Sequence, residues 1–128
     1  MRKIFLSLLV LVTISSIAQD LPKNYASLLK EVEPELIAWR RHFHEFPELS
    51  NREVNTGKYI ADFLNTLPNL EVRYPVAKTG VVAVLKGGKP GAVIALRADI
   101  DALPVYERVA IPFASKVTTE FNGQKVNV

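Results

Sequence analysis

Apolar residues recur at helical spacing near the start of the chain. Between residues 24 and 46 they are three or four positions apart, which predicts a helix with one apolar stripe. Pro34 interrupts the stripe, so the helix either bends there or consists of two helices that meet. Pro47 ends the segment, because the residue before a proline is pushed towards extended geometry. The stripe consists of Leu28, Val32, Leu36, Trp39 and Phe43.

A second helix is expected shortly after Pro47. Ser50 and Glu53 have the spacing of a capping box, a hydroxyl followed three residues later by a carboxylate. We therefore expect the helix to begin there and to close at Pro68 and Asn69. Its apolar face would consist of Val54, Tyr59, Ile60, Phe63, Leu64 and Leu67.

Beyond residue 69 the pattern becomes that of strands. Residues 70–74 alternate weakly, and 81–85 and 92–96 are apolar runs. The glycines and proline of 87–91 predict a turn that joins the last two runs as an antiparallel pair, with both faces largely covered. Two helices followed by strands predict an α/β or α+β fold. The rest is less patterned, with loops at 113–115 and 122–124 and strand-like alternation over 125–128.

The first eighteen residues resemble a secretory signal peptide. Arg2 and Lys3 give a positive start, 4–12 is almost entirely apolar, and Ser16-Ile17-Ala18 offers small residues for cleavage after Ala18. The apolar run is about a dozen residues, whereas a spanning helix needs roughly twenty. We therefore expect no stable membrane anchor. Residues 19–128 would be secreted or periplasmic.

Composition narrows the choice of function. Of 128 residues 48% are apolar. The chain has sixteen Lys and Arg and thirteen Asp and Glu, which give a net charge of +3. Without Arg2 and Lys3 the fourteen remaining cations leave +1, and no basic block occurs, so a nucleic-acid partner is not expected. The chain has no cysteine, which excludes disulfides, a thiol nucleophile and a Cys-bound metal within this sequence.

Two carboxylates form the most informative polar cluster. Asp99 and Asp101 directly follow the apolar run 92–96, and functional sites of open α/β sheets gather beyond strand ends. In an extended chain both side chains point to the same side. They are therefore candidate catalytic residues, able to bind a metal or to orient a metal-bound imidazole. The alternative is structural: Asp99 pairs with Arg97 or caps a turn, and Asp101 is solvated.

Other polar groups are less suggestive. His42 and His44, the only histidines, are two residues apart and would face different ways on a helix, so we do not expect a ligand pair. Glu45 and Glu48 could approach them across the following turn, although turn carboxylates are more often solvated. The glycines of 87–91 match neither common phosphate-binding motif, and no GxSxG motif supports a serine hydrolase. No cofactor-binding residues are expected.

Four segments together resemble one enzyme family. Residues 39–50, WRRHFHEFPELS, resemble the opening helix and HxxPELS turn of metal-dependent amidohydrolases. This family includes hippurate hydrolase, N-acyl-amino-acid hydrolases and plant auxin-conjugate hydrolases. Residues 79–83, 96–104 and 112–115 resemble its TGVVA, LRADMDALP and PFAS segments. The resemblance runs from about residue 28 to residue 128, in the family's order.

The resemblance implies a two-domain hydrolase with a zinc-peptidase-like α/β catalytic domain. A smaller inserted domain covers the site, and relatives often form homodimers. A divalent metal, zinc or manganese, is expected in the full-length enzyme, with an N-acyl amino acid or small peptide as substrate. In relatives with His at the position of Arg97, the residue matching Asp99 orients that metal-bound His. Here the resemblance therefore implies at most an orienting role for Asp99.

The family's metal ligands would lie beyond this sequence. Relatives continue after the match to Val128 with a segment like MHACGHD, whose Cys and His bind metal. We therefore expect residues 19–128 to be an incomplete, truncated catalytic domain, without metal or cofactor and inactive alone. The alternative is a non-catalytic secreted remnant or binding module that reuses this segment.

Overall fold

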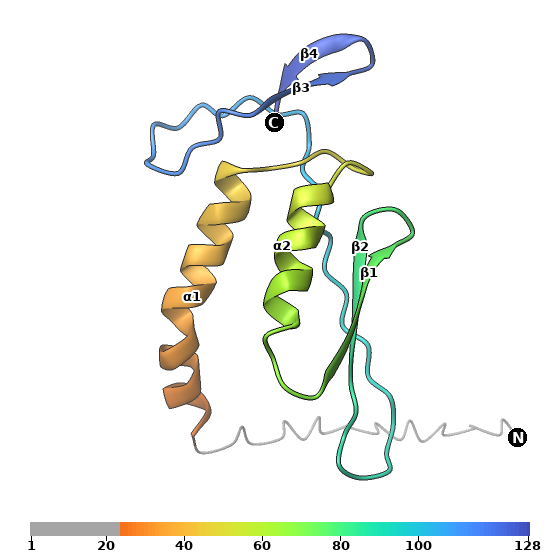
Figure 1. Ribbon diagram of the computed structural model, residues 1–128. Coiled ribbons are helices and arrows are strands. Elements are labelled where there is room, and N and C mark those ends of the chain that lie inside the picture. Colours follow the sequence, from red (N-terminus) through yellow and green to blue (C-terminus); the bar gives the residue numbers. More distant parts are fainter. Residues whose placement is uncertain (1–23) are drawn as a thin grey trace, which may run out of the picture. The chain divides into compact units, whose positions relative to one another are not determined.

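The computed structural model describes residues 24–128, and the expected signal peptide, residues 1–18, lies outside them. The chain divides into two units, residues 1–32 and 33–128. Two helices followed by short strands confirm the predicted α/β class (Figure 1). Neither helix of the described residues is long and apolar enough to cross a membrane. The elements are α1 (Tyr25–Glu45), α2 (Val54–Leu64), β1 (Leu70–Val76), β2 (Gly80–Leu85), β3 (Thr118–Phe121) and β4 (Gln124–Asn127).

The helix α1 runs for 21 residues through Pro34 without a break. Proline costs an interior helix one hydrogen bond, but here it does not divide the segment into two helices. Trp39, on the predicted apolar stripe, meets Phe63 of α2 edge to face, with ring centroids 4.7 Å apart. No residue of α1 is fully buried, and Leu36 remains 49% exposed. The predicted stripe is therefore only partly covered.

The helix α2 begins later than predicted, because the capping box does not form. Asn51 has a φ of +64°, and Arg52 donates its N–H to the carbonyl of Leu49 at 2.9 Å. This turn moves the helix start to Val54, with Glu53 at the N-cap position and without a side-chain cap bond of its own. The fully buried residues of α2 are small, Thr56, Gly57 and Ala61, whereas Ile60, Phe63 and Leu64 of the predicted apolar face are half-buried.

The strands β1 and β2 form an antiparallel hairpin (Figure 1). Leu70 lies opposite Leu85, and β1 alternates between half-buried and exposed residues. The turn contains Ala77 and Lys78 with positive φ angles of 48° and 89°. Both strands were predicted, but their pairing was not.

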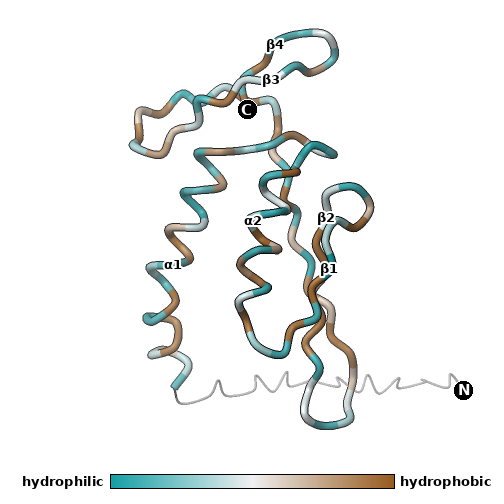
Figure 2. The backbone as a smooth tube through the Cα atoms, viewed as in Figure 1, coloured by the Kyte–Doolittle hydropathy of each residue, from teal (hydrophilic) through white to brown (hydrophobic). Residues whose placement is uncertain are grey.

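The predicted strand at 92–96 does not form. Val93, Ile94 and Leu96 are 97%, 84% and 97% exposed, and Figure 2 colours hydrophobic positions along this irregular stretch after β2. A strand needs a neighbour for its N–H and C=O groups. Within residues 24–128 no strand pairs with this run, since the two sheets consist of β1 with β2 and of β3 with β4. The expected antiparallel pair with both faces covered is therefore wrong.

The strands β3 and β4 form a second antiparallel hairpin, with Thr118 opposite Asn127. Its turn is Asn122-Gly123, with φ angles of 52° and 75°, and consecutive positive φ values suit a tight hairpin turn. The predicted loop at 122–124 and the strand-like alternation over 125–128 are confirmed in outline. The strand β3 was missed, although Asn-Gly is a strong hairpin signal.

The helix α2 packs closely on the β1–β2 hairpin at Gly57, which has no side chain. A Cβ atom on Gly57 would lie 2.4 Å from the carbonyl oxygen of Thr79 and 2.7 Å from Cε2 of Tyr74. Only glycine allows this approach. The hydroxyl of Tyr74 donates a hydrogen bond of 2.7 Å to the carbonyl of Val54 and fixes the same contact.

Candidate functional site

The turn between α1 and α2 is held by the side chain of Glu48. Its Oε2 accepts the N–H of Thr56 at 2.7 Å. Its Oε1 accepts the N–H and the side-chain amide of Asn55 at 3.2 and 2.8 Å. These N–H groups belong to the first turn of α2, where a carboxylate is favoured. Burial acts to raise the pKa of Glu48, but the hydrogen bonds from Thr56 and Asn55 outweigh it and hold the pKa below its usual value.

A second carboxylate, Glu53, connects this turn to the β1–β2 hairpin. The side chain is buried, with a residue exposure of 6%. Oε1 accepts the N–H of Asn51 at 2.9 Å, and Oε2 accepts the hydroxyl of Thr79 at 2.7 Å. Burial opposes ionisation, but the Thr79 hydroxyl and the neighbouring N–H groups lower the pKa of Glu53. The turn before α2 is therefore fastened on two sides.

The segment that carries the two aspartates reaches the same turn. Ala102 donates its N–H to the carbonyl of Glu48 at 2.8 Å, and Leu49 forms a parallel bridge with Ala102. Leu49 itself is only 4% exposed. The backbone beside Asp101 is thus attached to the capped end of α2.

Asp99 and Asp101 are both exposed. Oδ1 of Asp99 accepts a hydrogen bond from Nη2 of Arg97 at 2.9 Å. The structural alternative for Asp99, pairing with Arg97, is therefore present. The candidate roles of Asp99 and Asp101 in catalysis stay predictions.

A groove of about 380 Å³ brings both aspartates together with Glu48. Thr56 provides a further polar group, and Ile60 of α2 belongs to the apolar part of the lining. A concave lining that is mainly apolar and has a few polar groups is typical of small-molecule sites. This groove is the candidate site nearest to the predicted residues.

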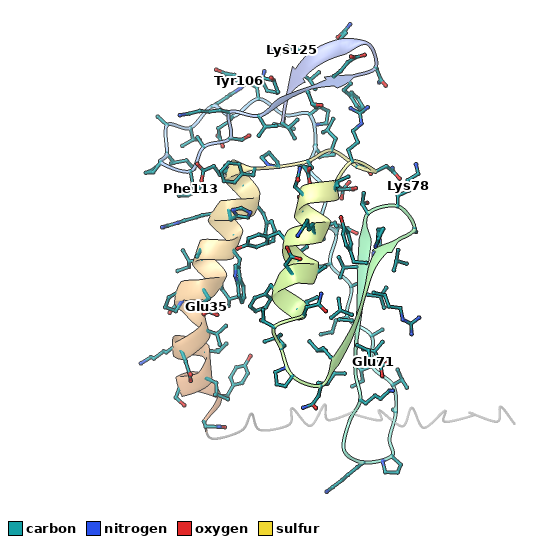
Figure 3. The ribbon with its side chains drawn as sticks, in the orientation of Figure 1. Glu35, Glu71, Lys78, Tyr106, Phe113 and Lys125 are labelled. Carbon is teal, nitrogen blue, oxygen red and sulfur yellow. The ribbon has the colours of Figure 1, made fainter. Side chains whose placement is uncertain are left out.

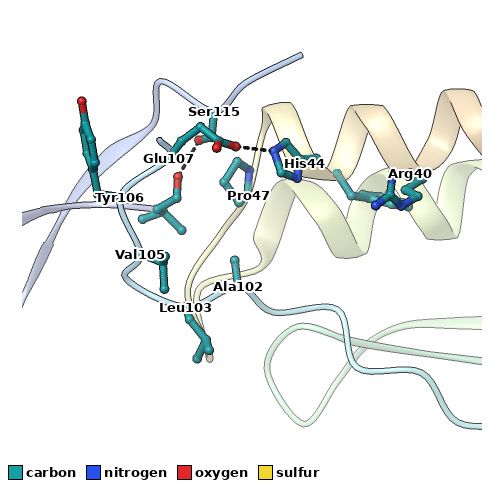
Figure 4. Close-up of a pocket in the computed structure, with 11 residues that line it drawn as sticks. Arg40, His44, Pro47, Ala102, Leu103, Val105, Tyr106, Glu107 and Ser115 are labelled. Carbon is teal, nitrogen blue, oxygen red and sulfur yellow. Dashed lines mark hydrogen bonds and ion pairs between the residues drawn. The ribbon is translucent and has the colours of Figure 1, made fainter. Parts of the chain in front are cut away.

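A second cavity of about 580 Å³ lies at the end of α1 (Figure 4). His44 and Glu107 meet in its wall, with Nε2 and Oε2 2.6 Å apart. Arg40 and Tyr106 also line it. The sequence pattern gave no sign of Glu107, because the contact joins positions 63 residues apart.

The two histidines face different neighbours, as their spacing on a helix predicts. His42 stacks on Tyr59 of α2, with ring centroids 4.2 Å apart and an interplanar angle of 22°. His44 instead contacts Glu107 and the edge of Phe113. The guanidinium of Arg41 lies 5.0 Å from the centroid of Phe113, a cation–π contact. Both histidines thus contribute to packing at the end of α1, where His44 contacts Phe113, which is labelled in Figure 3.

The donors present do not fit a metal pair. Within residues 24–128, no three His, Asp or Glu side chains come close enough together to hold one ion. Asp99 and Asp101 alone fall short of the three protein ligands of a hydrolytic zinc site. Residues 24–128 therefore supply no complete metal site of their own.

No protein-family model matches the chain. Individual relatives do match it strongly. An N-acyl-L-amino acid amidohydrolase from Geobacillus stearothermophilus is 47% identical over 89 residues, which are 70% of this chain and 24% of the relative. Thermostable carboxypeptidase 1 from Saccharolobus solfataricus is 46% identical over 99 residues, 77% of this chain and 25% of the relative.

A solved structure is similar as well. A dinuclear metal-binding peptidase of the M20 family from Bacillus subtilis matches with a TM-score of 0.62 and 50% identity, over 69% of this chain and 24% of that one. The chain spans about a quarter of the length of the curated relatives it matches. The homologues and structural neighbours of this chain are thus amidohydrolases and peptidases of the M20 family.

Proposed function

We propose that the whole protein is a metal-dependent hydrolase that cleaves the amide bond of N-acyl amino acids or small peptides. The observation that carries this proposal is the 47% identity to an N-acyl-L-amino acid amidohydrolase over 70% of the chain. The groove that contains Asp99 and Asp101 supports it, because it joins an apolar wall to carboxylates.

The residues described supply part of such a site. Asp99 would orient a metal-binding group from elsewhere in the protein by accepting its N–H, as carboxylates commonly do for metal-bound histidines. Asp101, two residues further on, would face the same groove. The metal, zinc or manganese, would supply an activated water and polarise the substrate carbonyl.

Export and assembly are further parts of the proposal. The positive start, apolar run and small residues of 1–18 support a cleaved signal peptide and a secreted or periplasmic enzyme. N-terminal sequencing of the secreted product should find Gln19 first, whereas retention of residues 1–18 in a membrane fraction would contradict export. Assembly into homodimers is proposed from the family resemblance alone.

A non-catalytic remnant or binding module is the second candidate. One observation favours it: the described residues hold no metal-binding cluster. The DNA that follows codon 128 discriminates between the two. A continuing frame that encodes a Cys-Gly-His-Asp segment supports the enzyme, whereas a stop codon followed by family-like sequence supports a degraded gene.

The activity test uses protein expressed from the complete reading frame. Amino-acid release from hippurate is measured with added zinc or manganese and again after a chelator. We expect release that depends on the metal. Folded protein that releases no amino acid from any N-acyl amino acid or dipeptide, with either metal, would contradict the proposed function.

A further inference from the structure

The glutamate of the turn before α2 is placed to do more than cap a helix. Glu48 accepts N–H groups of Asn55 and Thr56 through its side chain. Its own carbonyl accepts the N–H of Ala102 at 2.8 Å. One residue therefore joins the first turn of α2 to the backbone next to Asp101.

Both attachments are made by the same residue, Glu48. The side chain of Glu48 fixes the turn against two N–H groups at a helix start, which need an acceptor. Fixing the turn also fixes the direction of the Glu48 carbonyl and the bridge between Leu49 and Ala102. The aspartate segment makes few other anchoring contacts, since residues 91–99 are exposed and form no strand.

We infer that Glu48 is a positioning residue for the candidate site: by capping α2 it holds the Ala102 backbone, and thereby sets where Asp99 and Asp101 stand in the groove. The inference rests on the proposed function only for its effect on turnover. Its structural part, the coupling between the Glu48 side chain and the Ala102 amide, can be measured without any activity.

Three variants of the protein from the complete reading frame test the coupling. Glu48→Ala removes the acceptor, and Glu48→Gln keeps one oxygen acceptor in nearly the same shape. The control is Glu35→Ala, which removes an exposed carboxylate of α1 (Figure 3). Hydrogen exchange of a peptide that contains the Ala102 amide is read by mass spectrometry, and kcat and KM are measured on hippurate.

We expect Glu48→Ala to speed exchange at Ala102 by about 5- to 30-fold, the change that follows from loss of a good helix cap. Turnover should fall by about tenfold or more in kcat, with a smaller change in KM. Glu48→Gln should restore part of both. If Glu48→Ala does not fold, the intermediate exchange expected of Glu48→Gln decides the question.

Exchange at Ala102 that is the same in both Glu48 variants and in Glu35→Ala would overturn the inference. Faster exchange at Ala102 in Glu48→Ala with an unchanged kcat would also overturn the inference, because the aspartates would then need no support from Glu48. Failure of the proposed function looks different: the unmodified protein would lack activity, while Ala102 exchange would still respond to Glu48.

Discussion

Nε2 of His44 and Oε2 of Glu107 lie 2.6 Å apart, although 63 residues separate them in the chain. His44 is in the last turn of α1, and Glu107 follows the aspartate segment. The N–H of Val109 and the side chain of His44 hold the pKa of Glu107 below its usual value. This contact attaches the chain after residue 102 to the end of α1, beside the cavity shown in Figure 4.

Replacing Glu107 should release that attachment. We expect Glu107→Gln to increase hydrogen exchange and protease cleavage around residues 103–109, because the ionic acceptor for His44 and Val109 is lost. Asp62→Asn is the control, since it weakens an exposed pair with Lys58 within α2. Equal protection of 103–109 in the two variants would show that the His44 contact does not hold this segment.

The small residue at the helix–hairpin contact should tolerate no side chain. Gly57→Ala gains about 1 kcal/mol in helix propensity, but its Cβ would stand 2.4 Å from the Thr79 carbonyl oxygen. Overpacking of this kind costs about 1–3 kcal/mol or more. We expect a net loss of stability in urea unfolding. Gly88→Ala, where a Cβ meets nothing within 4 Å, should be nearly neutral, and equal midpoints for both variants would refute the close contact.

Acid should loosen the turn before α2. The pKa values of Glu48 and Glu53 are both lowered in the folded chain, so their ionised forms stabilise it. This contribution is present above the unfolded value near 4.5 and is lost as the pH falls through the lower folded values. Glu53→Gln should flatten the fall in stability below pH 4.5, as followed by thermal melts. A variant with an unchanged acid profile would contradict this origin.

The substitution Glu53→Gln also replaces a charged hydrogen-bond acceptor by a neutral one at neutral pH. There we expect Glu53→Gln to cost about 1–3 kcal/mol, because a neutral amide replaces the carboxylate that accepts hydrogen bonds from Thr79 and Asn51. A matched change at the exposed carboxylate of Glu71 on β1 (Figure 3) should leave stability nearly unchanged.

The aspartates should matter for turnover more than for folding. In protein from the complete reading frame, Asp99→Ala should lower kcat/KM by about 10- to 100-fold, the effect expected of a residue that orients a metal ligand. Its melting temperature should barely change, since its contact with Arg97 is exposed. Unaffected turnover would leave Asp99 with only its pairing to Arg97.

The sequence predicts best those features that depend on contacts between residues close together in the chain. Local periodicity predicted α1, α2, β1 and β2, because each pattern reflects neighbouring residues along the chain. Strand pairing was harder to predict. The run at 92–96 has the composition of a strand, but no strand of the described residues pairs with it. The capping box does not form because the turn at Asn51 moves the helix start to Val54, and Glu48, outside the motif, accepts the N–H groups there.

The candidate site was only partly predictable. Asp99 and Asp101 stood out by their position after an apolar run, and they do line one groove. Two contacts, His44 with Glu107 and Glu53 with Thr79, join residues far apart in sequence. No short motif indicates such contacts. The family resemblance was more informative than the hydrophobic pattern, because motifs shared with related proteins imply the same local contacts.

The proposed metal-dependent activity is tested most directly by the metal bound per polypeptide after dialysis, measured beside amino-acid release from hippurate. We predict bound zinc or manganese and turnover for protein from the complete reading frame, and neither for residues 19–128 alone, whose donors do not gather into a metal site in the described part. Stoichiometric metal with turnover by residues 19–128 alone would contradict it.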